Sequence, residues 1–165
     1  MTEPRFTHVD ESGAARMVDV SGKEISVRSA TATGAVLVSA EVVALLRGGG
    51  VPKGDAIAVA RIAGIQAAKR TPDLVPLCHP IAIHGVTVDL EVRDDRVAIS
   101  ATVRTADRTG VEMEALTCVS VAALALVDMV KAVDPAAVIT DVRVEEKLGG
   151  KTGVWRREPG PRDGR

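Results

Sequence analysis

The stretch VTVDLEVRDDRVAISATV, residues 86–103, decides the fold of this chain. Two runs of alternating apolar and polar residues flank a polar turn at Asp94-Asp95. The apolar positions are Val86, Val88, Leu90 and Val92 in the first run and Val97, Ile99, Ala101 and Val103 in the second. Alternation with a period of two places one face of a strand in the core, so this stretch predicts a β-hairpin whose apolar face must be covered.

Two helices are predicted, one before and one after the hairpin. Asp55 is a suitable N-cap for a helix that runs to about residue 70, and this stretch is apolar nearly all round, which predicts a largely buried helix. The second, longer helix is predicted over residues 110–133, ending before Asp134-Pro135 because the residue before a proline avoids the helical conformation.

The remaining segments complete a familiar order. Residues 24–38 predict a strand bent near Gly34, and residues 138–146 predict the last strand. Residues 40–47 predict a short helix with Ser39 as its N-cap. Residues 71–85 contain three prolines and predict an irregular connection. The order β-α-β-β-α-β is that of an α+β fold, a ferredoxin-like two-layer sandwich with an antiparallel sheet and its helices on one face.

The domain organisation is expected to be simple. We expect residues 1–153 to form a single domain, since 165 residues fit one domain of ordinary size. Residues 154–165 are rich in Gly, Pro and charge and predict a disordered C-terminal tail. Residues 13–20 are a candidate for a short edge strand.

The composition disfavours several classes of function. With 21 basic and 22 acidic residues the net charge is −1, so no global field attracts nucleic acid or an anionic membrane. The chain has one Phe, one Trp and no Tyr, whereas an RNA-binding module of this topology would need exposed aromatic residues for base stacking. Without a signal-peptide pattern or a charge-free run of 18 residues, we expect a cytoplasmic protein with no membrane contact.

Cys78 and Cys118 have neither the number nor the spacing of a disulfide framework. Two interpretations of Cys78-His79-Pro80 remain open: a buried thiol beside a hydrogen-bonded histidine, or an imidazole that transfers protons. A zinc site made of Cys78, His79 and His84 would lack the usual spacing and a fourth ligand. The sequence therefore predicts no bound metal.

Asp128 and Lys131 lie three residues apart and share one face of the long predicted helix. They form either a solvated ion pair or a coupled acid/base pair. The preceding residues 121–127 are apolar, and an Asp and a Lys on so buried a helix would need a partner or a ligand. A non-catalytic, ligand-binding regulatory domain would not explain the pair.

Glu112 and Glu114 begin the same helix. Thr109 and Glu112 have the spacing of a capping box, and Glu114 suits the helix dipole. Either carboxylate could instead accept the N–H groups of a guanine-like ring, and the pattern does not separate these options.

Basic residues beside glycines are candidates for binding an anion. Lys53 precedes a glycine and Lys151 follows Gly149-Gly150, so the backbone can approach a phosphate closely at both places. Neither segment is a P-loop, which disfavours nucleotide hydrolysis of that type. Arg28 and Lys147 are further candidates, although a single basic residue is usually a solvated surface residue.

Several segments between about residue 7 and residue 153 resemble the MoaC family in order and spacing. They are Met17-Val18-Asp19-Val20, Lys53-Gly54-Asp55, residues 60–71, Pro76-Leu77-Cys78-His79-Pro80, residues 109–117, residues 128–133 and Gly149-Gly150-Lys151. Long motifs in register are far more specific than any single short motif.

The resemblance implies a lyase of molybdenum cofactor biosynthesis. Its substrate would be 3′,8-cyclo-7,8-dihydroguanosine 5′-triphosphate, and its products cyclic pyranopterin monophosphate and pyrophosphate. The resemblance also implies a homohexamer, built as a trimer of dimers with active sites at subunit interfaces. We expect no tightly bound cofactor and expect any Mg²⁺ to arrive with the triphosphate, because the sequence contains no dedicated carboxylate cage.

The resemblance also implies roles for individual residues. Asp128, Lys131 and Lys53 match catalytic positions of the family. The positions that match substrate-binding residues are Leu77, Cys78, His79, Met113, Glu114, Glu112, Arg28 and Lys147.

Overall fold

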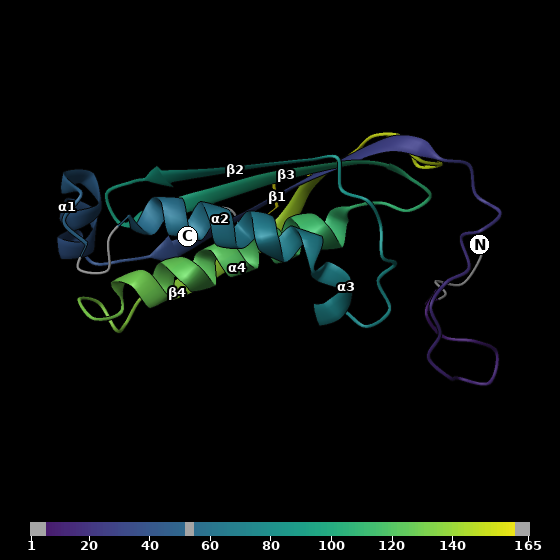
Figure 1. The fold of residues 1–165 in the computed structure, drawn as a ribbon, viewed down its shortest axis with the longest axis horizontal. Helices are drawn as coiled ribbons and strands as arrows, with labels where there is room; N and C mark the ends of the chain where they lie inside the picture. Colours follow the sequence, from purple (N-terminus) through teal and green to yellow (C-terminus); the bar gives the residue numbers. More distant parts are fainter. Residues whose placement is uncertain (1–5, 52–54, 161–165) are drawn as a thin grey trace.

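The structure is a computed structural model that describes residues 6–51 and 55–160. Its elements follow the order β1 (Ser26–Leu37), α1 (Ala40–Gly48), α2 (Ala56–Lys69), α3 (Thr71–Leu74), β2 (Gly85–Val92), β3 (Arg96–Asp107), α4 (Glu112–Val130), β4 (Val138–Leu148) and β5 (Trp155–Arg156). Figure 1 shows α2 and α4 side by side on one face of the sheet. The predicted α+β ferredoxin-like sandwich is confirmed.

The sheet has the strand order β2-β3-β1-β4-β5, and each neighbouring pair is antiparallel. The hairpin β2-β3 pairs Val86 with Val103 and Val92 with Val97, as the alternation predicts. Its apolar face packs beneath the helices. Around Gly34 the register of β1 against β4 shifts twice, so the irregularity expected there lies in the pairing while β1 itself runs unbroken.

Small residues allow the two long helices, α2 and α4, to pack closely against each other. A Cβ atom on Gly64 of α2 would lie 2.9 Å from the backbone oxygen of Cys118 and 3.1 Å from Cβ of Ala122 on α4. Only a residue without a side chain allows this approach. Burial raises the pKa of Cys118 to about 12, so this cysteine is a neutral packing residue.

Helix α4 is long and apolar enough to cross a membrane by length and composition alone. Half of that apolar window is buried, because α4 packs against α2 and against β1, β3 and β4. Such burial is typical of a core helix, which passes the same test.

Two of the three predicted helix starts are confirmed. Ser39 Oγ accepts a hydrogen bond from Val42 N at 3.3 Å, and Asp55 Oδ1 accepts one from Ala58 N at 2.9 Å. The capping box of Thr109 and Glu112 is wrong. Helix α4 begins at Glu112 itself, so its N-cap is Val111, whose side chain has no acceptor, and the Glu112 carboxylate bonds to Lys147 instead.

Three further predictions need correction. Helix α2 is buried on one side only, and Ile62 on its outer side is 58% exposed, because no second layer within the described residues covers the helices. Residues 13–20 form no strand; Ala15 makes one isolated bridge with Val9. In the segment predicted to be disordered, Trp155 and Arg156 form β5, which pairs with Lys147 and Glu146 of β4.

Candidate functional site

One cavity of about 350 Å³ lies where the N-terminal segment, the connection after α3 and the start of α4 meet. These segments are far apart in the sequence, and the fold brings them together at one end of the helical layer. The cavity gathers six of the predicted substrate-binding residues, namely Leu77, Cys78, His79, Glu112, Met113 and Glu114.

Glu112 is held by a residue from the opposite layer. Lys147 Nζ, on β4, donates to Glu112 Oε1 at 3.0 Å, and both side chains are about one-third exposed. Partial burial makes such an ion pair stronger than a solvated one and orients the carboxylate. The pair therefore joins an acid and a base that the sequence predicted separately for the same site.

Glu114 differs from Glu112 in its surroundings. It is 3% exposed, and burial, with a contribution from the neighbouring Glu112 carboxylate, raises its pKa. A carboxyl group with a raised pKa keeps its proton to higher pH and can donate a hydrogen bond or a proton. The two carboxyl groups of the cavity are thus chemically distinct.

Cys78 lines the same cavity as a partly buried thiol. Burial first, and then the charges of Glu114 and Glu112, raise its pKa. Since the thiolate is the nucleophilic form, Cys78 is suited to contact a ligand and unsuited to attack one.

His79 is oriented by the N-terminal segment. Its Nε2 atom lies 2.5 Å from the backbone oxygen of Val18. Because a carbonyl oxygen can only accept, Nε2 carries the hydrogen and Nδ1 is the acceptor in the neutral ring. The histidine is therefore held in one tautomer at the wall of the cavity.

Arg28 is held against the glycine pair that follows β4. Its Nε atom donates to the backbone oxygen of Asp107 at 3.1 Å. A Cβ atom on Gly150 would lie 2.5 Å from Nη1 of Arg28, and Gly150 also has a positive φ of 72°. Arg28 and Lys147 project from the same face of neighbouring strands, since Ala30 is the register partner of Lys147.

Asp128 and Lys131 form an ion pair of 2.7 Å, from Nζ to Oδ1, at the other end of α4. Their side chains are 56% and 57% exposed, which corrects the expectation of a buried pair. An ion pair so exposed contributes at most about 1 kcal/mol to stability. Lys53, the third predicted catalytic residue, lies outside the described residues.

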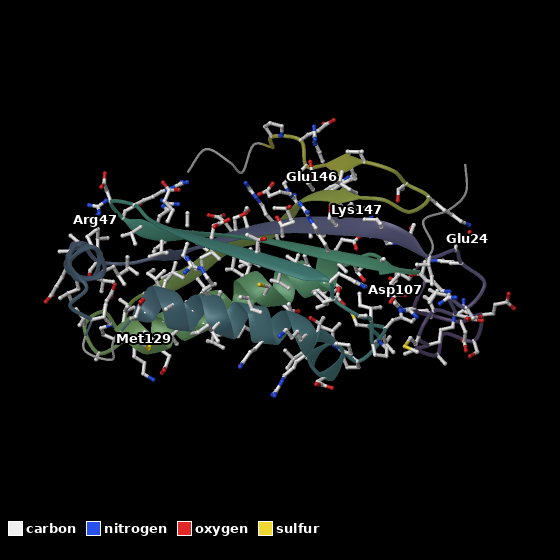
Figure 2. The ribbon with its side chains drawn as sticks, turned by 45° about the horizontal axis from the view of Figure 1, so that its top comes forward. Glu24, Arg47, Asp107, Met129, Glu146 and Lys147 are labelled. Atoms are coloured by element: carbon white, nitrogen blue, oxygen red, sulfur yellow. The ribbon has the colours of Figure 1, made fainter. Side chains whose placement is uncertain are left out.

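Within the described residues, the Asp128–Lys131 pair and the cavity lie apart on α4. Sixteen positions of α4 separate Glu112 from Asp128, which corresponds to roughly 24 Å along the helix axis at 1.5 Å per residue. In Figure 2, Met129, next to Asp128 in the sequence, lies at one end of the helical layer, and Asp107 lies toward the opposite end. The structure thus divides the predicted site into two parts.

The cavity also contains residues that the sequence analysis did not assign. Thr7, His8, Val18 and Val20 line it from the N-terminal segment, together with Lys23. Composition gives no signal for these residues, but the resemblance to the MoaC family includes residues 17–20 and could have indicated Val18 and Val20. Within residues 6–51 and 55–160, no group of three His, Cys, Asp or Glu residues could hold a metal ion.

The structure is an α+β sandwich with a small cavity lined by two carboxyl groups, a thiol, histidines and a lysine, which suits a small polar ligand. The sequence model described as "MoaC family" matches residues 17–150, and the chain belongs to the MoaC family. A relative from a Nocardioides species is 73% identical over 156 residues, covering 93% of this chain and 96% of the relative, and is named cyclic pyranopterin monophosphate synthase.

Two other relatives carry corresponding names. A protein of Streptomyces coelicolor, named cyclic pyranopterin monophosphate synthase, is 71% identical over 155 residues, covering 94% of this chain and 91% of the relative. A protein of Mycobacterium bovis, named cyclic pyranopterin monophosphate synthase 2, is 60% identical over 152 residues, covering 92% of this chain and 91% of the relative.

Proposed function

We infer that this chain is a cyclic pyranopterin monophosphate synthase, a lyase of molybdenum cofactor biosynthesis. It converts 3′,8-cyclo-7,8-dihydroguanosine 5′-triphosphate to cyclic pyranopterin monophosphate with release of pyrophosphate. The observation that carries this conclusion is family membership over residues 17–150, together with 73% identity to a synthase that matches nearly end to end.

The cavity supplies the contacts that such a substrate needs. Glu112 accepts N–H groups of the guanine-derived ring, and the carboxyl group of Glu114 accepts through its carbonyl oxygen or donates its proton to the ring. These contacts replace aromatic stacking in a chain with almost no aromatic residues. Lys147 is held within reach of the same cavity by Glu112, and Arg28 projects from the same face of the sheet. Both cations suit the phosphate groups and the departing pyrophosphate.

The exposed pair on α4 supplies proton transfer. Opening and rebuilding the ring requires several proton transfers, for which Asp128, Lys131 and Lys53 are the acids and bases. A ribose hydroxyl then attacks the α-phosphorus in line, the bond to the β-phosphate oxygen breaks, and pyrophosphate leaves with its charge balanced by cations.

An assembly is proposed because the two parts of the site are roughly 24 Å apart along α4 in one chain. We propose a homohexamer, a trimer of dimers, in which each active site lies between the cavity of one subunit and the Asp128–Lys131 pair of another. A solvent-accessible stripe on α4 supports this arrangement, and it consists of Met113, Thr117, Ser120, Leu124, Asp128 and Lys131. An antiparallel partner helix centred near Ser120 would bring Asp128 beside the partner's cavity.

The remaining expectations are also proposals. We propose that the enzyme acts in the cytoplasm without nucleic acid or a membrane as a partner. No tightly bound cofactor is needed for the chemistry above, and Mg²⁺ can reach the site as a complex with the triphosphate.

Incubation of the purified protein with the cyclised dihydroguanosine triphosphate tests this function. We expect release of pyrophosphate and, after oxidation, a fluorescent pterin. Tight binding of the substrate without either product would contradict the synthase and would favour a ligand-binding regulatory protein instead.

A further inference from the structure

The C-terminal end of β3 bonds both to the connection that lines the cavity and to Arg28 of β1. The backbone oxygen of Arg104 accepts a hydrogen bond from His84 N at 2.9 Å, and that of Asp107 accepts one from Arg28 Nε at 3.1 Å. Between these two positions lies Thr105, which is 2% exposed. Its hydroxyl donates to the backbone oxygen of Ala82 at 2.5 Å.

Ala82 belongs to the binding loop, residues 75–84, which carries Leu77, Cys78 and His79. The loop contains neither helix nor strand, and its two prolines lack the amide donors that could anchor it. Cys78 N bonds to the oxygen of Val75, which is a turn within the loop itself. The hydroxyl of Thr105 reaches the loop from the core and so joins it to the rigid sheet.

A hydroxyl at this buried position needs an explanation. The neighbouring inward-facing positions of β3 are Val97, Ile99, Ala101 and Val103, and a valine at position 105 would continue this pattern. Burying a hydroxyl is unfavourable unless it is hydrogen-bonded, whereas a β-branched apolar residue packs well on a strand. The contact that offsets this cost at Thr105 is the bond to the binding loop.

We propose that Thr105 is a positioning residue that holds the binding loop, and through it Cys78 and His79, in place at the cavity. Its effect on turnover rests on the proposed function, whereas its effect on the position of the loop does not. His84, at the end of the loop, also bonds to Arg104 and Ala106 of β3, and the bond from Thr105 to Ala82 adds a link that comes from a core side chain.

The test compares Thr105→Val, which removes the hydroxyl at nearly constant shape, with Thr105→Ser, which keeps it. Thr102→Val is the matched control, because Thr102 lies on the same strand and bonds to Thr31 Oγ1 at 2.8 Å, away from the loop. Each variant is measured for thermal stability, for KM and kcat, and for the rate at which iodoacetamide alkylates Cys78. Cys118 is buried and serves as an internal control for unfolding.

Thr105→Val is expected to raise KM about tenfold, because a small misplacement of binding groups is costly. Alkylation of Cys78 should become about threefold faster or more, as the loop opens locally. Thr105→Ser should keep both KM and the Cys78 alkylation rate near their wild-type values, and Thr102→Val should change neither. A Thr105→Val protein that is less stable but has an unchanged KM and an unchanged Cys78 rate would overturn the proposal. If the wild-type protein shows no turnover, the alkylation rates of Cys78 alone decide whether Thr105 positions the loop.

Discussion

The predicted site residues at the two ends of α4 differ in their burial and in their contacts. At the N-terminal end, Glu112 is paired with Lys147 and Glu114 is almost fully buried, so the cavity is largely formed within one chain. At the C-terminal end, Asp128 and Lys131 stand exposed, in a pair that adds little to stability. Under the proposed assembly, this difference means that one end of α4 binds the ligand, whereas the other supplies chemistry to a site that another subunit completes.

The largest effect is expected at the exposed end. Asp128→Ala and Lys131→Ala should each reduce turnover by about 10³-fold, because a positioned acid or base contributes on that order. The measurement is pyrophosphate release, with the oligomeric state checked by light scattering. Asp94→Ala, which breaks the similarly exposed pair with Arg47, is the control and should retain full activity. Retained activity in both α4 variants would contradict the assignment of this end.

A smaller effect is expected at the buried end. Lys147→Ala leaves the Glu112 carboxylate without this cation beside Glu114, and we expect KM to rise about tenfold with a smaller change in kcat. Steady-state kinetics measures both parameters. Arg156→Ala removes a pair with Glu146 elsewhere on β4 and should leave KM unchanged. Equal KM values in the two variants would show that Lys147 has no part in binding.

The smallest effect concerns Glu114. Because burial raises its pKa in the folded protein, the folded state holds this proton at pH values where the unfolded chain has lost it. Its contribution to stability is therefore present below the ordinary value of 4.5 and declines as pH rises through the folded pKa. As the pH rises from 4.5 through the folded pKa of Glu114, the melting temperature of the wild type should fall relative to that of Glu114→Gln. Parallel pH profiles would contradict a raised pKa.

The sequence predicted those features that depend on neighbours along the chain. Alternation predicted the β2-β3 hairpin, and the N-caps Ser39 and Asp55 were recognised because capping is local. The capping box failed because Glu112 bonds to Lys147, which is 35 residues away, and only the folded sheet brings that lysine near. In the same way β5 was missed, since a two-residue strand depends on the edge offered by β4.

For the site, motif resemblance located residues but could not give their surroundings. It indicated six residues that do line one cavity, yet the apolar residues around Asp128 suggested burial where the structure has exposure. A helix that is apolar in composition still has an outer face when only one layer of helices covers the sheet. The distance between the two ends of α4 follows from helix length and became informative only when the cavity was located.

The most direct test of the central claim is a subunit-mixing experiment with His79→Ala and Asp128→Ala. Each variant alone should be inactive, because each lacks one part of every site. If sites form between the subunits of a dimer, random mixing restores about a quarter of the sites, since half of the dimers are mixed and each mixed dimer has one intact site. Co-expression followed by pyrophosphate release should therefore recover about a quarter of wild-type activity. No recovery, with mixed assemblies demonstrated by mass spectrometry, would contradict a shared site and place both parts within one chain.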